Sequence, residues 1–332
     1  MLKYRFHVLF ICMYLLIHPQ WMHGQYINEE PFAHTFSIVA FDPETGDMGI
    51  AVQSHWFSVG TTVAWGEAGA GIIATQAVVN IGFGPNGLAL LKKGISPDSV
   101  LHKLLQADPA RDIRQLAILD TNGNIAVSTG KMCVAEAGHQ QGRFYSVQAN
   151  TAESKDVWKM MAAAYEQTDG PLAARMIAAL EAAQAAGGDI RGKQSACLLV
   201  VRKKPTGKIW LDRKVDIRVE DNPDPIKELK RIYIIKTAYD AVNLGYYYLE
   251  KNDPDAADEA FNKAEKLNPG NSEMKFWYAV ELANKGMDDR ALDVFKTVFR
   301  QDPVWKIKML PRIVNAGVLN VPSELLKRIE KL

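Results

Sequence analysis

The amino-acid sequence predicts an α+β domain, in which two stacked antiparallel sheets carry helices on both outer faces, followed by a domain built only of helices. Two observations lead to this fold class. Between residues 34 and 226, paired strand-like segments are interleaved with paired helix-like segments. After residue 226 the strand signals stop, and a helical pattern recurs with a period of 34 residues.

The length and charge of the chain limit what it can be. Its 332 residues are enough for two domains, each with its own hydrophobic core. Its 39 lysines and arginines nearly cancel its 38 aspartates and glutamates, which leaves a formal net charge of +1. Binding to nucleic acid or to an anionic membrane surface through charge requires a basic excess. We therefore expect no nucleic-acid partner.

The first residues are typical of a secretory signal peptide. Lys3 and Arg5 precede a short apolar run, and polar residues follow. Gly24 supplies a small residue before the cut, so we expect a leader over residues 1–24, a lead-in over 25–33 and an exported protein, periplasmic or secreted. A short membrane anchor is the alternative. Once the leader is removed, no remaining segment has the length and apolarity of a membrane span.

The residues that usually bind metals or phosphates are scattered. Cys133 and Cys197 would remain after leader removal, and neither has companions at metal-ligand spacing. His102 falls in a predicted helix and His139 in a predicted loop. The glycines of residues 59–82 do not have the spacing of a phosphate-binding loop. We expect no metal and no cofactor.

The first predicted hairpin organises the rest of the chain. Its strands, Thr35–Phe41 and Met48–Ser54, are rich in β-branched and aromatic residues, and the Asp-Pro and Thr-Gly pairs between them supply turn geometry. The apolar run Gly71–Val79 is typical of a strand that is covered on both faces.

The later elements alternate between helix pairs and strand pairs. Ser96 and Pro97 open a helix as an N-cap and a first-turn proline, and Asn122-Gly123 is a strong hairpin signal. We expect helices over 84–93, 96–106, 154–167 and 171–186, and strands over 114–119, 124–129, 144–149, 195–201 and 208–219.

A domain boundary falls at Asp221–Pro225, where two prolines and two aspartates occur together. We expect domains over 34–226 and 227–332, and the second matches the tetratricopeptide pattern. The matching positions are Ala241, Leu244, Gly245, Tyr248, Ala257, Phe261, Ala264 and Pro269. A shift of 34 residues gives Lys275, Tyr278, Ala279, Leu282, Ala291, Phe295, Val298 and Pro303. Only Lys275 departs from the pattern.

Two such repeats bury little core alone, and at least three are usually needed. We expect a long first helix over 231–250 and capping segments over 304–316 and 322–332 to complete the domain. Its expected role is to dock a protein partner or to form a homo-oligomer.

Thr35 is the candidate nucleophile. A threonine at a chain terminus carries both a hydroxyl group and an α-amine with a pKa near ~8, so it needs no distant histidine as a base. Thr35 begins the first strand, where such a residue would lie, but the His34–Thr35 bond would first have to be broken. The alternative is that Thr35 is an ordinary β-branched strand residue.

Several short motifs are distributed over residues 34–230. They are His34-Thr35-Phe36-Ser37-Ile38-Val39-Ala40, Asp42-Pro43 with Thr45-Gly46, Gly49 with Ala51-Val52, Ala74-Thr75-Gln76, Gly84-Pro85 with Gly87-Leu88, Gly187-Gly188-Asp189 with Arg191-Gly192, Gln194-Ser195, and Asp221-Asn222-Pro223-Asp224-Pro225. Together they resemble a family of bacterial proteins that is labelled a domain of unknown function. The fold of that family resembles the N-terminal nucleophile (Ntn) hydrolases.

The resemblance implies a four-layer αββα fold and a place near the amide hydrolases. In many relatives the equivalent threonine follows the initiating methionine or the end of a leader, and so becomes terminal. This chain departs from that pattern by the extra segment Gln25–His34.

Polar residues within apolar strands are candidates for a site around Thr35. Gln76 and Asn150 are expected to polarise the substrate carbonyl as catalytic residues. Arg191 is expected to orient the substrate, and with Asp189 it could instead form an ion pair that stabilises a turn. The expected substrate-binding residues are Ser37, Ser54, Asp189, Arg191, Gln194 and Ser195.

These residues support two main readings of function. The first is an exported hydrolase of amide or peptide bonds, of Ntn type, acting on a small-molecule or peptide substrate. The alternative is a non-catalytic protein that binds a small ligand or a cell-wall fragment and docks a partner through its repeats. A scaffold in which the repeats carry the main function is a third reading.

Overall fold

A computed structural model describes residue 31 and residues 33–332. The predicted leader and most of the lead-in therefore lie outside the described residues. The chain divides into two compact units, with the boundary between Ile226 and Lys227. Among the described residues, every helix is too short or too polar to cross a membrane.

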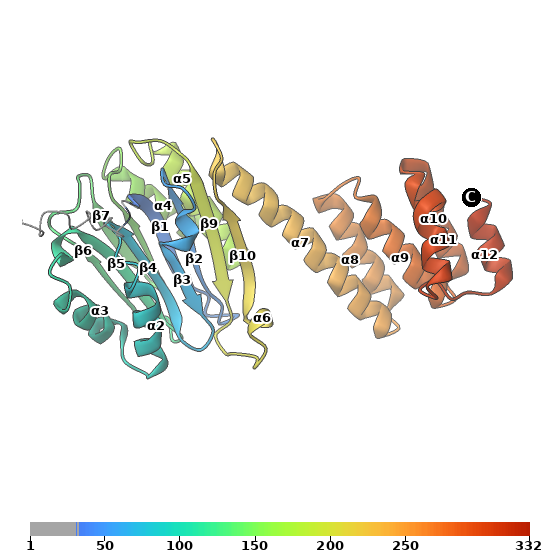
Figure 1. Ribbon diagram of the computed structural model, residues 1–332, viewed down its shortest axis with the longest axis horizontal. Helices are drawn as coiled ribbons and strands as arrows, with labels where there is room; N and C mark the ends of the chain where they lie inside the picture. Colours follow the sequence, from blue (N-terminus) through green and yellow to red (C-terminus); the bar gives the residue numbers. More distant parts are fainter. Residues whose placement is uncertain (1–30, 32) are drawn as a thin grey trace, which may run out of the picture. The chain divides into compact units, whose positions relative to one another are not determined.

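The first unit contains two antiparallel sheets, as predicted (Figure 1). The six-stranded sheet has the order β10-β9-β2-β1-β8-β7, with β1 at Thr35–Phe41, β2 at Met48–Ser54, β7 at Gly138–Gly142, β8 at Tyr145–Ala149, β9 at Ser195–Val201 and β10 at Arg213–Val219. The four-stranded sheet has the order β3-β4-β5-β6, with β3 at Ala64–Glu67, β4 at Gly71–Ala77, β5 at Arg114–Asp120 and β6 at Ile125–Thr129.

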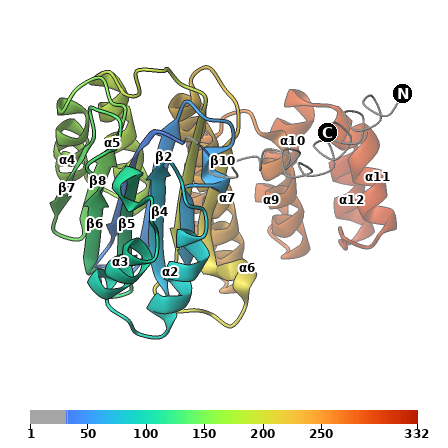
Figure 2. The same cartoon turned by 60° about the vertical axis from the view of Figure 1, so that its left-hand side comes forward.

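Helix pairs cover the outer face of each sheet (Figures 1 and 2). Helices α2 (Phe83–Lys92) and α3 (Pro97–Gln106) contact the four-stranded sheet, and α4 (Asp156–Gln167) and α5 (Leu172–Ala185) contact the six-stranded sheet. The Ser96 hydroxyl group accepts a hydrogen bond from the N–H of Ser99, which caps α3 as the sequence indicated.

The two sheets pack face to face around an apolar interior. Val39, Ile50, Ile72 and Leu119 are fully buried there. The antiparallel register places Thr35 of β1 opposite Ser54 of β2, so the apolar interior gives way to polar side chains at this end of the sheets.

Four elements differ from the sequence prediction, and one of them is α7 (Pro225–Glu250), which begins before the predicted start at residue 231. Strands β3 and β7 were not predicted, because β3 is short and the exposed edge strand Gly138–Gly142 has no apolar alternation. The prediction of His139 in a loop is wrong, because it lies on β7. The prediction of one strand over 208–219 is also wrong at its start, where the helical turn α6 (Ile209–Asp212) precedes β10.

The second unit is entirely helical. Its elements are α7 (Pro225–Glu250), α8 (Pro254–Leu267), α9 (Ser272–Asn284), α10 (Asp288–Gln301), the π-helix η4 (Trp305–Met309), α11 (Leu310–Asn315) and α12 (Ser323–Glu330). Small residues allow close packing, since a Cβ atom on Gly245 would lie 2.6 Å from the ring of Phe261. Lys275, which departs from the repeat pattern, forms an ion pair of 2.8 Å with Glu265.

Replacement of Gly84 by alanine tests the packing of α2 on the four-stranded sheet. A Cβ atom at Gly84 would lie 2.3 Å from ring carbons of Trp65, which cannot move as a flexible chain end can. We expect Gly84→Ala to lower the free energy of unfolding by about 1–3 kcal/mol, measured by chemical denaturation.

Gly87→Ala in the same helix is the matched control. Its new Cβ would also meet an atom at 2.3 Å, but that atom is the terminal Cδ1 of Ile73, which can rotate away. Alanine is a better helix former than glycine by about 1 kcal/mol, so this variant is expected to be close to neutral. Equal losses for the two variants would contradict the packing described.

Candidate functional site

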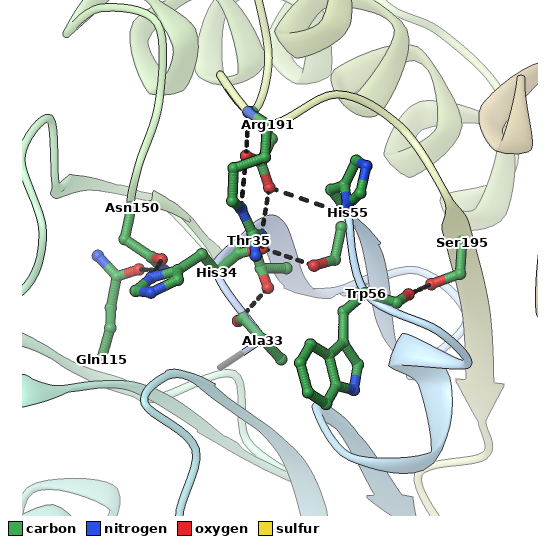
Figure 3. Close-up of polar contacts among 11 residues, drawn as sticks. Ala33, His34, Thr35, His55, Trp56, Gln115, Asn150, Arg191 and Ser195 are labelled. Atoms are coloured by element: carbon green, nitrogen blue, oxygen red, sulfur yellow. Dashed lines mark hydrogen bonds and ion pairs between the residues drawn. The ribbon is translucent and has the colours of Figure 1, made fainter. Parts of the chain in front are cut away.

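The candidate site lies where β1 begins and β2 ends (Figure 3). Residues before Thr35 run alongside the end of β4: the carbonyl of Ala33 accepts a hydrogen bond from the N–H of Ala77 (3.2 Å), and that of Pro31 accepts one from Val79 (2.9 Å). Thr35 is fully buried, and its hydroxyl group donates to the carbonyl of Ala33. In the intact chain, the preceding residues therefore cover Thr35.

The carbonyl oxygen of His34 belongs to the peptide bond that precedes Thr35, and two side chains hold it. The hydroxyl group of Ser54 donates to it at 2.5 Å, and Nη2 of Arg191 donates to it at 2.5 Å. One donor is charged, and hydrogen bonds from charged donors are the stronger class. This arrangement polarises the carbonyl and would stabilise negative charge on its oxygen.

Asp189 fixes the guanidinium group of Arg191. Its Oδ2 lies 2.6 Å from Nη2 of Arg191, and its Oδ1 accepts from Nε and from the backbone N–H of Arg191, each at 3.0 Å. Oδ2 also accepts a long hydrogen bond of 3.4 Å from the N–H of His55. The side chain of Asp189 is fully buried, whereas that of Arg191 is 28% exposed. The pair thus stabilises its turn and also aims the arginine at the His34 carbonyl.

The ring of His34 is held by Asn150, which directly follows β8, the neighbour of β1 in the same sheet. Its Nδ1 lies 2.8 Å from Oδ1 of Asn150, whose Nδ2 donates to Oε1 of Gln115 at 2.9 Å. Because Oδ1 of Asn150 must then accept, Nδ1 of His34 carries the proton. Burial lowers the pKa of His34 below its ordinary value of 6.5; the Asn150 hydrogen bond opposes the shift and the Arg191 charge adds to it. His34 is therefore neutral at pH 7.

Gln115 is the centre of a hydrogen-bond network between the sheets. Its Oε1 accepts from Asn150 and from Nε2 of Gln76 (2.6 Å). Its Nε2 donates to the Thr129 hydroxyl group (2.8 Å) and to the carbonyls of Ala149 (3.0 Å) and Gly138 (3.1 Å). The residue is fully buried, so each of these bonds replaces a lost contact with water.

Ser37 continues the network along β1. It donates to Oε1 of Gln76 at 2.5 Å and accepts from Nε2 of Gln148 at 2.7 Å. Ser146 in turn donates to Oε1 of Gln148 at 3.1 Å. All four side chains are fully buried, so Ser37 and Gln76 fill the interior between the sheets.

The predicted site residues separate into two groups. Thr35, Ser54, Asp189 and Arg191 meet around the His34 carbonyl, and Asn150 reaches the same residue through its ring. The other predicted site residues, Ser37, Gln76, Gln194 and Ser195, make no hydrogen bond to that carbonyl among the described contacts.

Gln194 and Ser195 form hydrogen bonds to the end of β2 and to the loop that follows it. The N–H of Gln194 donates to the carbonyl of Ser54 at 3.1 Å. The hydroxyl group of Ser195 donates to the carbonyl of Trp56 at 2.5 Å and accepts from the N–H of Val59 at 3.0 Å. These contacts anchor the loop that follows β2.

The sequence prediction did not include His34, Gln115 or Gln148 among the site residues. Gln115 and Gln148 each interrupt an apolar strand, which is the same signal that identified Gln76, and it could have identified them. His34 could be recognised only from the structure, because its role comes from its backbone carbonyl.

Two sizeable cavities of the described chain lie elsewhere. One of about 800 Å³ is bounded by α2, β9 and β10, and one of about 700 Å³ lies beside α3. Neither is lined by Thr35. Within the described residues there is also no group of three or more His, Cys, Asp and Glu side chains that could hold a metal ion.

Comparisons with known proteins place the first unit in a family. A protein-family model described as "Family of unknown function (DUF1028)" matches residues 35–229. The chain belongs to the DUF1028 family. A crystal structure of a DUF1028 protein from Silicibacter pomeroyi is 31% identical to this chain, covers 60% of this chain and 88% of its own, and superimposes with a TM-score of 0.55. The DUF1028 match begins at Thr35, the residue whose hydroxyl group is buried at the candidate site.

The second unit also has a recognised repeat. A tetratricopeptide-repeat model matches residues 241–271, which include the C-terminal part of α7 and all of α8. This repeat indicates interaction with protein partners. A search of curated proteins found no match to this DUF1028 chain.

Replacement of Gln115 by methionine tests whether the network holds the sheets together. The volume is similar, but Gln76 and Asn150 would keep buried N–H groups without their acceptor. Each buried unpaired donor costs about 1–3 kcal/mol, so we expect Gln115→Met to lower the free energy of unfolding by at least about 2 kcal/mol.

Gln53→Met is the matched control, because Gln53 is equally buried and neither amide atom has a hydrogen-bond partner among the described residues. We expect this change to stay within about 1 kcal/mol of the parent chain or to stabilise it. Chemical denaturation of both variants provides the measurement, and a Gln53 variant as unstable as the Gln115 variant would refute the assigned role of the network.

Proposed function

We propose that the first unit is a self-processing hydrolase of amide or peptide bonds, of the N-terminal nucleophile type with a four-layer αββα fold. Thr35 is its nucleophile, and residues 1–24 are a leader that directs its export. The observation that carries the proposal is the pair of hydrogen bonds from Ser54 and Arg191 to the His34 carbonyl. Two side chains converge on the bond whose cleavage would make Thr35 terminal.

The self-processing step follows from this geometry. The Oγ1 atom of Thr35 attacks the carbonyl carbon of His34, and the oxyanion that forms is held by Ser54 and Arg191. The carbon–nitrogen bond then breaks, and the hydroxyl proton passes to the departing nitrogen, which becomes the α-amine of Thr35. Water hydrolyses the resulting ester and releases the preceding segment with a carboxylate at His34.

The mature site would use the same groups on other substrates. The free α-amine, with a reference pKa near ~8, takes the hydroxyl proton of Thr35 as general base. Ser54 and Arg191 then face the carbonyl of the incoming amide, and Asp189 keeps the guanidinium group in place. The start of the family match at Thr35 supports this reading, because the residues before it lie outside the matched region.

The processing proposal makes a direct prediction about the purified protein. We expect intact mass and N-terminal sequencing to show a chain that begins at Thr35. Thr35→Ala should retain His34, whereas Thr35→Ser should still be cleaved. Ser54→Ala and Arg191→Gln should each slow cleavage by about 10²–10³-fold, since each removes one oxyanion donor.

Arg218→Gln on β10 is the control for loss of an arginine, because Arg218 forms its ion pair with Asp216 instead. It should be cleaved at the parent rate. A parent chain that keeps residues 31–34, or a Thr35→Ala chain that is still cut after His34, would rule the mechanism out.

The uncleaved Thr35→Ala chain also has an expected pH dependence. The pKa of His34 is lowered by folding, so the unfolded chain binds a proton at higher pH than the folded chain does. We expect the free energy of unfolding to fall as the pH drops below about 6.5 and to be unaffected by His34 above it. A further His34→Gln change should make this slope shallower, as urea denaturation between about pH 5 and 8 can measure. An unchanged slope would show that His34 is not held neutral.

A second candidate function is a non-catalytic protein that binds a small ligand or cell-wall fragment. The complete burial of Thr35, with its hydroxyl group bound to Ala33, favours this reading for the intact chain. In that case the purified protein keeps His34, and Thr35→Ala leaves ligand binding unchanged. In both readings the repeats of the second unit dock a protein partner.

A further inference from the structure

Pro31, Ala33 and His34 make contacts with the first unit like those of an extended peptide. The carbonyl of Pro31 accepts a hydrogen bond from the N–H of Val79, and the carbonyl of Ala33 accepts one from the N–H of Ala77. This spacing of two residues on each side is the pattern of a strand added to a sheet. The backbone of this segment, independent of its side chains, therefore supplies part of its binding.

Two of the segment's side chains are also enclosed. Ala33 is fully buried and belongs to the apolar cluster between the sheets, together with Val59 and Val79. His34 is 7% exposed, and its ring is bound to Asn150. The position two residues before Thr35 thus has room for a small side chain, and the position next to Thr35 offers a hydrogen-bond acceptor.

The backbone at the end of β4 is shaped for this contact. Ala77 has a φ of 71°, a left-handed conformation that residues other than glycine rarely adopt, and its N–H is one of the two donors to the segment. Such outliers persist where the surrounding structure enforces them, and they cluster at functional sites.

Five exposed apolar side chains lie in loops that adjoin strands of the two sheets. They lie in the loops that follow β2, β4 and β6 and in the loop that precedes β9. The residues are Phe57, Ile81, Met132, Val134 and Ile190.

We infer that residues 31–34 occupy the acyl side of the substrate site, and that the mature domain takes an extended peptide in their place. This inference rests on the proposed function. The substrate chain pairs with the N–H groups of Ala77 and Val79. It carries a small residue two positions before the bond that is cut, and a hydrogen-bonding side chain directly before that bond. The substrate class is thus a peptide, in contrast to sugar amides or other small amides that offer no extended backbone.

Fluorogenic peptides test the inference on the purified, self-processed protein. The parent substrate is Pro-Phe-Ala-His linked through an amide to aminomethylcoumarin, which reproduces residues 31–34. We expect its kcat/KM to exceed that of Pro-Phe-Trp-His-aminomethylcoumarin by at least about tenfold, because the tryptophan cannot enter the space of Ala33. Acetyl-His-aminomethylcoumarin, which lacks the carbonyls equivalent to Pro31 and Ala33, should lose at least about tenfold as well.

Binding of the released product gives a second measurement that does not need turnover. Pro-Phe-Ala-His with a free carboxylate should bind the mature protein in calorimetry, and its affinity should fall at least about tenfold for Pro-Phe-Trp-His. Self-cleavage in cis gives a third, since Ala33→Trp should slow it while the exposed change Glu44→Gln should not.

The outcomes separate the two proposals. A purified chain that retains His34 overturns the proposed function and this inference with it. A chain that begins at Thr35 but treats the three peptides alike, or binds the product tetrapeptide no better than its tryptophan variant, overturns the inference alone. Discrimination in favour of Pro-Phe-Ala-His supports both.

Discussion

The hydrogen bonding of Gln115 is the constraint on which the first unit depends. Two sheets packed face to face can exclude water with apolar side chains, but at one end of this interface the chain places a row of buried amides and hydroxyl groups. A buried amide is stabilising only if all of its polar atoms are paired. Gln115 meets this condition with five partners, four on strands of the two sheets and the fifth, Asn150, directly after β8, and it thereby fixes the spacing of the strands.

The same network positions the candidate site. Asn150 is bound to Gln115 on one side and to the ring of His34 on the other, so the peptide bond before Thr35 is located by contacts that begin deep between the sheets. From the opposite side, Asp189 locates Arg191. His34 is therefore held from two sides, at its ring by Asn150 and at its carbonyl by Ser54 and Arg191. The site and the core of the sandwich are stabilised by one set of polar contacts.

The second unit follows a simpler physical rule. Its repeats pack helices closely through small residues such as Gly245, Ala279 and Ala291, and its core consists almost entirely of apolar side chains. Stability in such a unit comes from contacts between neighbouring repeats, and the tetratricopeptide match indicates interaction with protein partners. The DUF1028 match and the tetratricopeptide match thus fall mainly in separate units of one chain.

Local sequence patterns predicted the bounds of an element correctly where a single local signal, burial or capping, fixes them. The strand Ser195–Val201 and the helix that starts at Pro97 have the bounds expected from their sequences, because burial and capping are local signals. Strand β7 was missed because an exposed edge strand needs no apolar alternation. The polar residues Gln76 and Asn150 were recognised as unusual, but their partners could not be inferred, because these come from strands more than thirty residues away in the chain.

The sequence alone determined the classes of structure: antiparallel hairpins with helix pairs, a boundary near Pro225, and a repeat with a period of 34 residues. These features follow from local propensity and periodicity, which a single sequence records. Only the tertiary structure decided which groups meet at Thr35. In the fold, Ser54, Asp189 and Arg191 lie around the carbonyl of His34, whereas Gln76 lies in the interior between the sheets. The physical reason is that a backbone carbonyl has no signature in the sequence, and its donors are chosen by the register of strands that are distant in the chain.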